Sequence, residues 1–226
     1  MKNTTINLGV IKKVALALNE LNERVMYVGG AVVSLYVNDP AADDVRPTKD
    51  VDISLEIASL GELEKLREDL TRKGFVQKSE DDVICRFRYE DVKVDVMSTK
   101  EVGWAPSDKW FKPGFQNSEE VKIENTRIRI MPLAYFLATK FNAFHDRGSS
   151  DARTSHDFED ITYILDNRTD LVEVISTSPA DVKKYLKSQF DTIFKSDKLQ
   201  EAIQGNLYYE TRTIRFNLIM EKLKRL

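Results

Sequence analysis

The chain has 226 residues, of which 42% are hydrophobic and 31% are charged, a composition typical of a globular protein with one domain or two small lobes. Its longest apolar stretches, such as residues 25–37, are interrupted by Gly or polar residues and fall short of the ~20 residues needed to cross a bilayer. We therefore expect no membrane partner. The amino terminus lacks the cationic start, apolar run and cleavage site of a secretory signal, which favours a cytoplasmic location.

The numbers of cysteine, histidine and charged residues limit the kinds of metal site and of binding partner that the chain can have. One cysteine, Cys85, and two histidines allow neither an intramolecular disulfide nor a zinc site built from thiolates or imidazoles, so any metal must be held by carboxylates. A net charge of −3 argues against a general DNA-coating protein. Acidic residues crowd segment 39–52 and basic residues crowd segment 127–153, which would suit a carboxylate metal site facing a cationic phosphate clamp.

The first part of the chain combines helical and strand periodicities. Apolar spacing predicts an opening helix, and a short apolar run ending at Gly29-Gly30 predicts a strand, a glycine turn and a short helix. Ser59 and Glu62 form a capping box before an amphipathic helix that ends at Gly74. The expected elements are a helix at 8–22, a strand at 25–28, a short helix at 31–36, a loop at 38–47, a strand at 51–57 and a helix at 59–73.

The next part predicts a β-meander, and the last part is helical. Glu90-Asp91 reads as the tight turn between the second and third strands of the meander. The expected strands are 75–79, 83–89 and 92–97, then a hairpin of 121–124 and 126–130; the expected helices are 132–145, 155–165, one starting at Ser178-Pro179, 195–204 and 208–226. The fold class is therefore α/β in the α+β sense, with a mixed-sheet lobe at 1–130 and a helical lobe at 131–226.

The residues with most chemical information are Asp50, Asp52 and Asp95. Residues two apart on a strand point to the same face, so the first two carboxylates project together and repel unless a cation lies between them. Asp95 lies on the face opposite Val92, Val94 and Val96 of a later strand. If the two strands are neighbours, three carboxylates converge, enough to bind one or two Mg²⁺ ions. The alternative is that these are solvated acids on an edge strand.

The Gly29-Gly30 pair lies where the predicted strand meets the predicted short helix. Glycines at such a turn allow backbone N–H groups and the helix N-terminus to approach a phosphate closely. This order of elements resembles the DNA polymerase beta-like nucleotidyltransferase superfamily: a strand, Gly-Gly, a short helix, Asp-X-Asp and a later third acid. The interval from Gly30 to Asp50 is 50 − 30 = 20 residues, longer than is usual there, and segment 38–45 reads as the insertion.

A narrower resemblance covers about residues 25–165. Gly-Gly-Ala-Val-Val-Ser-Leu at 29–35 and Arg-Pro-Thr-Lys-Asp-Val-Asp at 46–52 are similar to segments of the AbiEii family of nucleotidyltransferase toxins, and so are the later segments 137–140, 146–148 and 156–161 with Arg153. The resemblance implies a nucleotidyltransferase fold with a catalytic lobe at 1–130. It implies metal binding by Asp50, Asp52 and Asp95, and nucleotide binding by Gly29, Gly30 and Lys140 with support from Arg147, Arg153, Asp157 and Asp160.

Each of these later positions also has an interpretation without nucleotide. Lys140 on an amphipathic helix either reaches a phosphate or is a lysine whose stem covers apolar surface. Arg147 and Arg153 flank the polar segment 148–151, which either closes over a nucleotide or is a solvated loop. Asp157 and Asp160 share one helical face. They either orient Lys140 or Arg147 by ion pairing, or complement the helix dipole.

The functional hypothesis is a Mg²⁺-dependent nucleotidyltransferase that moves NMP from an NTP to an acceptor hydroxyl and releases pyrophosphate. The resemblance implies an RNA acceptor, such as tRNA, and a toxin of a toxin–antitoxin system with a cognate antitoxin. Two alternatives stay open. One is a small-molecule nucleotidyltransferase of the aminoglycoside type, and the other is a non-catalytic nucleotide-binding module. The sequence does not identify the NTP, the acceptor or the oligomeric state.

Overall fold

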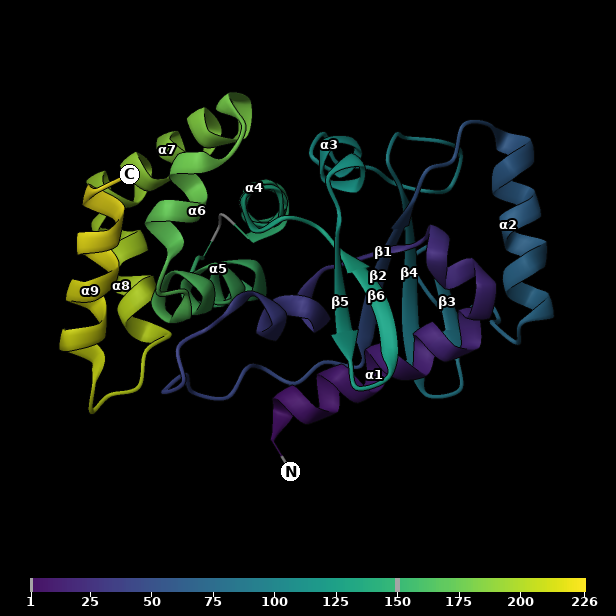
Figure 1. Ribbon diagram of the computed structural model, residues 1–226, viewed down its shortest axis with the longest axis horizontal. Coiled ribbons are helices and arrows are strands. Elements are labelled where there is room, and N and C mark those ends of the chain that lie inside the picture. Colours follow the sequence, from purple (N-terminus) through teal and green to yellow (C-terminus); the bar gives the residue numbers. More distant parts are fainter. Residues whose placement is uncertain (1, 149–150) are drawn as a thin grey trace. The chain divides into compact units, whose positions relative to one another are not determined.

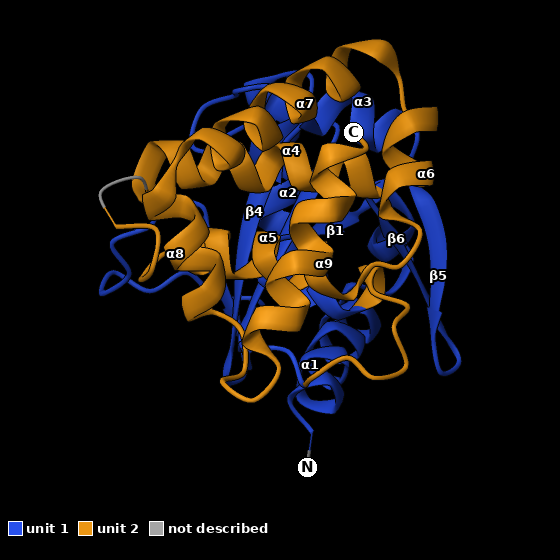
Figure 2. Cartoon of the chain, turned by 90° about the vertical axis from the view of Figure 1, so that its left-hand side faces the viewer, with its two compact units in different colours: residues 1–34, 44–132 blue, residues 35–43, 133–226 orange. Residues whose placement is uncertain are grey.

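The computed structural model describes residues 2–148 and 151–226 of the chain. It divides into two compact units, which Figure 2 shows in separate colours. Unit 1 comprises Met1–Ser34 and Asp44–Pro132, and unit 2 comprises Leu35–Asp43 and Leu133–Leu226. The assignment of 1–130 as a catalytic lobe and of 131–226 as a helical lobe stays a prediction.

Unit 1 is built on a six-stranded sheet in the order β3-β4-β2-β1-β6-β5 (Figure 1). The pairs β1–β2, β3–β4 and β5–β6 are antiparallel, whereas β2–β4 and β1–β6 are parallel. This mixed sheet, together with the many helices, confirms the predicted α/β fold class. The strands are β1 (Met26–Val28), β2 (Asp50–Leu55), β3 (Arg86–Tyr89), β4 (Val92–Ser98), β5 (Glu119–Ile123) and β6 (Thr126–Ile130).

Two long helices accompany this sheet. Helix α1 (Asn3–Leu18) buries Ile11, Val14 and Leu18 completely and packs against β2 and β6. It begins and ends earlier than predicted and continues as the 3₁₀ helix η1 (Asn19–Arg24). Helix α2 (Leu60–Arg72) begins as predicted, because the Ser59 hydroxyl accepts a hydrogen bond from the Glu62 N–H at 3.3 Å. The Glu62 carboxylate accepts from the N–H of Ala58 rather than Ser59.

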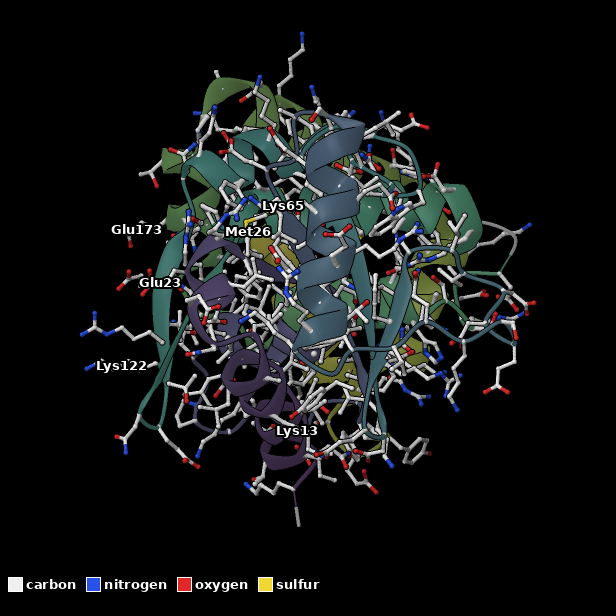
Figure 3. The ribbon with its side chains drawn as sticks, turned by 90° about the vertical axis from the view of Figure 1, so that its right-hand side faces the viewer. Lys13, Glu23, Met26, Lys65, Lys122 and Glu173 are labelled. Carbon is white, nitrogen blue, oxygen red and sulfur yellow. The ribbon has the colours of Figure 1, made fainter. Side chains whose placement is uncertain are left out.

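Lys13 ties α1 to the β3–β4 hairpin (Figure 3). Its ammonium donates to the carboxylates of Glu90 at 2.8 Å and Asp91 at 3.0 Å, and these hydrogen bonds raise the Lys13 pKa. Glu90 has φ +54°, which confirms the predicted tight turn at Glu90-Asp91. Figure 3 also shows Glu23 of η1 and Lys122 of β5 projecting outward from unit 1.

Two predictions about the middle of the chain were wrong. Residues 75–79 form no strand; they meet β3 through one isolated bridge, Val76 with Arg88, and through the ring contact of Phe75 with Tyr89, and charged residues from 78 to 82 end the apolar pattern. The meander is therefore a hairpin. Helix α3 (Phe111–Gln116) lies between the predicted strand 92–97 and the predicted hairpin, where no helix was expected. Its Pro113 and Gly114 concealed it, yet a Cβ at Gly114 would lie 2.7 Å from the Met131 side chain, so packing accounts for this glycine.

Unit 2 is helical around a core that includes Phe136, Phe141, Phe158 and Phe190. The helices predicted to start near 132, 155 and 178 are present, and Ser155 caps α5 by accepting from the Phe158 N–H. Helix α6 was not predicted. The helices are α4 (Leu133–Ala143), a π-helix (Phe144–Gly148), α5 (His156–Asn167), α6 (Leu171–Thr177), α7 (Ala180–Lys195), α8 (Asp197–Gly205) and α9 (Arg212–Lys224). No helix within the described residues is long and apolar enough to span a membrane.

Segment 35–43, most of which falls in the predicted insertion, is bound within unit 2. The backbone N–H groups of Asn38 and Asp39 both donate to the carbonyl oxygen of Asn167 at the end of α5. The guanidinium of Arg215 on α9 bridges the carboxylates of Asp39 at 2.9 Å and Asp166 at 2.7 Å. Residues 38–43 of the predicted insertion therefore belong to unit 2, whereas residues 44 and 45 belong to unit 1.

Candidate active site

Asp50, Asp52 and Asp95 lie on neighbouring strands of unit 1. Strands β2 and β4 are parallel, and the Cα of Asp52 is in register with that of Asp95, while Asp50 is in register with Lys93. Burial alternates along β4 and over the first four residues of β2, so the apolar residues there face the core and the three acids occupy the other face. The condition on which convergence of the carboxylates depended, that their strands are neighbours, is confirmed.

The segment before β2 is held by a buried asparagine of α1. Asn7 is completely buried, donates from its side-chain amide to the carbonyl of Arg46, and accepts from the N–H of Thr48. The Thr48 hydroxyl in turn accepts from the Asp50 N–H at 3.1 Å. These bonds tie the segment that leads into β2 to helix α1.

Gly29 and Asp52 are in direct steric contact. Val28, the last residue of β1, is in register with Asp52, and Gly29 follows with φ +73°. A Cβ at position 29 would overlap Oδ2 of Asp52 and lie 2.5 Å from its Cγ. The predicted short helix is present as the 3₁₀ helix η2 (Gly30–Tyr36). The glycine turn and the second acid of the motif therefore form one local structure.

Two cations accompany the acids, and sequence reasoning missed their roles. Arg86 on β3 donates from Nε and Nη2 to the two carboxylate oxygens of Asp95, each at 2.7 Å. This hydrogen bonding raises the pKa of Arg86. The ammonium of Lys93 lies 3.8 Å from Asp50, in a more exposed pair. The register of the β3–β4 hairpin places Arg86 opposite Asp95.

The chemistry of the three acids matches a hard divalent cation, because carboxylate oxygens are the ligands that Mg²⁺ prefers. Their arrangement is a different matter. Across residues 2–148 and 151–226, no three His, Cys, Asp or Glu side chains are grouped so that they could hold a metal ion. One physical reason why Asp95 does not join such a group is that both of its carboxylate oxygens are bound to Arg86. The donor set suits the metal, and Asp95 in this arrangement is paired with an arginine.

A second charged group lies within unit 2. The Lys140 ammonium, on α4, donates to Asp157 at 3.2 Å and to Asp160 at 2.7 Å, both on α5. The Arg147 guanidinium donates from Nε and Nη2 to the Asp157 carboxylate at 2.8 and 3.1 Å. Of the two interpretations of these acids, ion pairing with Lys140 and Arg147 is the one that the contacts show. Lys140 is 6% exposed, so the interpretation of an exposed lysine head was wrong.

The electrostatics of this group favour the ionised acid. Burial by itself would raise the pKa of Asp157, but the charges of Lys140 and Arg147 and their hydrogen bonds outweigh it and lower the pKa. The side chain of Arg147 is 72% exposed although its partner is buried. Asp157 therefore connects a buried lysine with an arginine that faces solvent.

Arg153 does not join this group among the described contacts. Its guanidinium pairs with Asp151 at 3.1 Å, and this pair is exposed. Ser149 and Ser150, the centre of the loop that was expected to close over a nucleotide, lie outside the described residues. The candidate residues thus form one group in unit 1, made of Gly29, Gly30, Asp50, Asp52 and Asp95, and one in unit 2, made of Lys140, Arg147, Asp157 and Asp160.

Comparison with known proteins identifies the family. No curated protein matches the chain. Similar solved structures include the antibiotic-resistance factor ANT(2'')-Ia, at 16% identity and a TM-score of 0.48 over 86% of this chain and 95% of that one. Another is an antigenic nucleotidyltransferase-like protein from Paracoccidioides brasiliensis, at 16% identity and a TM-score of 0.49 over 89% and 93%. The model of the family described as "Nucleotidyl transferase AbiEii toxin, Type IV TA system" matches residues 14–224. The chain is thus a nucleotidyltransferase and belongs to the AbiEii toxin family.

Proposed function

We propose that the protein transfers NMP from an NTP–Mg²⁺ complex to a hydroxyl group of RNA, with tRNA as the leading acceptor. The observation that carries the proposal is the juxtaposition of Asp52 with the Gly29 turn on one side and with Asp95 in register on the other. It brings a phosphate-binding type of backbone turn next to the acids that suit a metal.

In this reaction the acceptor oxygen forms a bond to the α-phosphorus, and the bond from that phosphorus to the oxygen bridging to the β-phosphate breaks. Pyrophosphate leaves with the electron pair of the broken bond. Asp50, Asp52 and Asp95 supply the oxygen ligands for Mg²⁺, which when bound neutralises triphosphate charge and makes a nearby hydroxyl more acidic. We assign to Asp95 the task of assisting removal of the acceptor proton.

The nucleotide is recognised by two kinds of donor in this proposal. Backbone N–H groups of Gly29 and Gly30 approach the triphosphate, because neither residue has a side chain of its own. As the family resemblance implies, we also propose that Lys140, Arg147 and Arg153 support nucleotide binding through their positive charge. Asp157 and Asp160 act through the cations, since Asp157 is bonded to both Lys140 and Arg147 and Asp160 to Lys140.

Family membership supports the biological part of the proposal. We propose that transfer to tRNA blocks growth and that a cognate antitoxin counteracts it. The acceptor class has a physical signature. Contacts to several RNA phosphates release counterions, so affinity for an RNA acceptor falls steeply as salt rises from about 50 to 200 mM, whereas affinity for a small aminated acceptor changes little.

The test is incubation of the purified protein with each α-labelled NTP, Mg²⁺ and total RNA, followed by measurement of label on RNA and of pyrophosphate. The Asp50→Asn and Asp52→Asn variants are run in parallel, with circular dichroism to verify their fold. Arg88→Gln is the matched control, because Arg88 lies on β3 and pairs with Asp81 rather than with any of the three acids.

Label on tRNA that disappears in both Asp variants and persists in Arg88→Gln supports the proposal. Label on a small acceptor, with none on RNA, replaces the RNA acceptor with an aminoglycoside-type one. The absence of pyrophosphate with every NTP and acceptor would refute transfer and favour a nucleotide-binding module.

A further inference from the structure

Arg86 has an unusual place for a cation in a site expected to bind metal. Its side chain is 17% exposed and that of Asp95 is 16% exposed, so the pair is largely removed from water. Both carboxylate oxygens accept from the same guanidinium, in the two-point geometry that arginine forms with carboxylates. Such a contact fixes the plane of the carboxylate as well as its charge.

Lys93 provides a second positive charge on the same strands. It lies on β4 two residues before Asp95, in register with Asp50, and its ammonium approaches Asp50. Among the described contacts, two of the three acids are paired with a cation of the chain itself. A divalent ion that arrives alone meets a site whose negative charge is largely balanced, and at Asp95 it must compete with a partly buried guanidinium.

We propose that Arg86 is a positioning residue that holds Asp95 and also competes with free divalent cations for it, so that the metal is loaded together with the NTP. The inference rests on the proposed function, which makes Asp95 a metal ligand. A triphosphate adds oxygen ligands and negative charge, and Mg²⁺ sites in proteins commonly combine one or two carboxylates with substrate phosphates. The nucleotide thus supplies the oxygen ligands and the negative charge that the metal lacks while Arg86 is bound to Asp95.

Strand β3 offers a matched control. Arg88 lies two residues after Arg86 on the same side of the strand, and its Nε and Nη2 bind the two oxygens of Asp81 at 2.9 and 2.6 Å. Its substitution removes a bidentate ion pair of the same kind from the same strand. Asp81 lies in the loop before β3 and is not one of the candidate metal ligands, so Arg88→Gln controls for loss of an ion pair alone.

The decisive measurement is a titration of the nucleotide-free protein with Mn²⁺ alone. Electron paramagnetic resonance measures the concentration of the free ion and hence the affinity. We expect Arg86→Gln to bind Mn²⁺ at least about tenfold more tightly than the wild type, because a competing charge is gone. Arg86→Lys keeps the charge and stays within about threefold of the wild type, as does Arg88→Gln. Arg86→Met keeps the side-chain stem and gives the same expectation as Arg86→Gln should the Gln variant fold poorly.

Turnover gives the second readout. Without the two-point contact from the Arg86 guanidinium, the Asp95 carboxylate is poorly oriented. We therefore expect kcat to fall about 10- to 100-fold in Arg86→Gln, while the KM for NTP stays within about threefold of the wild type. Arg86→Lys recovers part of kcat. Folded Arg86→Gln and Arg86→Met variants that bind Mn²⁺ no more tightly than the wild type would overturn the inference. The Mn²⁺ measurement uses no NTP, so it tests the role of Arg86 independently of turnover. A wild type that transfers no NMP would contradict the proposed function, whereas the Mn²⁺ affinities of the variants would still decide whether Arg86 competes with the metal.

Discussion

The carboxylate of Asp52 occupies the space that a side chain at residue 29 would fill. This contact joins the end of β1 to the second acid of the Asp-X-Asp motif on β2, and the register of Val28 with Asp52 produces it. Gly29 is therefore constrained twice, by its positive φ and by its neighbour. The glycine and the acid are parts of one structure, although 22 residues separate them in the chain.

Gly29→Ala should displace Asp52 and abolish NMP transfer. The left-handed backbone by itself costs an alanine about 1–2 kcal/mol, and the overlap with the Asp52 carboxylate adds to this cost. We expect a free energy of unfolding lower by at least about 2 kcal/mol in urea, and transfer at least about 100-fold slower.

Gly9→Ala is the control for that substitution. Gly9 lies within α1, and a Cβ there would have no atom within 4 Å. Alanine is the better helix former, so the variant should be more stable by about 0.5–1 kcal/mol with unchanged activity. Equal effects of the two substitutions would contradict the structural role assigned to Gly29.

The acidic site could be predicted to a considerable depth from sequence, because strand geometry is regular. The period of two places Asp50 and Asp52 on one face, and the two-residue turn at Glu90-Asp91 determines which residues of the hairpin face each other. Counting outward from that turn pairs Arg86 with Asp95, as the structure has it. The sequence therefore contains the signal that identifies Arg86 as the partner of Asp95.

Other features depend on distant parts of the chain and left no such signal. The parallel pairing of β1 with β6 joins residues about a hundred positions apart. Segment 75–79 has strand-like composition, yet only Val76 bridges to β3. For Lys140 the sequence allowed an exposed or a phosphate-facing head, and its burial between two acids of α5 became evident only from the packing of α4 against α5.

Lys140→Met should destabilise the protein, because it leaves buried acid without its lysine. Removing one partner of a buried ion pair costs about 3–5 kcal/mol, and Asp160, whose side chain is 2% exposed, is the residue most affected. Adding Asp160→Asn should restore about 1–3 kcal/mol of the unfolding free energy. Urea unfolding of the two single variants and the double variant measures this coupling.

The same double variant separates a structural role from a nucleotide role. If stability recovers and NMP transfer does not, Lys140 contributes to binding of the triphosphate. If both recover, Lys140 serves the fold alone and the assignment to the nucleotide site is wrong. Lys78→Met, at an exposed pair with Glu80, should leave stability and transfer unchanged within error.

Asp157 should make the protein sensitive to acid. Its pKa in the folded state is lowered, so its ionised form stabilises the fold above the unfolded pKa of about 3.9, and this stability is lost as the pH falls through the folded pKa. Urea unfolding between pH 6 and pH 2 should show that the wild type is more stable than Asp157→Asn at pH 6. The difference should shrink below pH 4; a constant difference would contradict the lowered pKa.

Cys85 offers a reporter of the charge at the acids, since it is the one cysteine in the sequence. It is buried as expected, and burial, with contributions from the carboxylates of Asp95 and Asp52, raises its pKa to about 11. At pH 8 about 0.1% of it is thiolate, against about a quarter of an ordinary cysteine, so iodoacetamide should modify the native protein at least about 100-fold more slowly than the unfolded chain. Asp95→Asn removes one of the charges and should accelerate the reaction, whereas Asp81→Asn should not. Equal rates in the two variants would show that the Asp95 carboxylate does not act on this thiol.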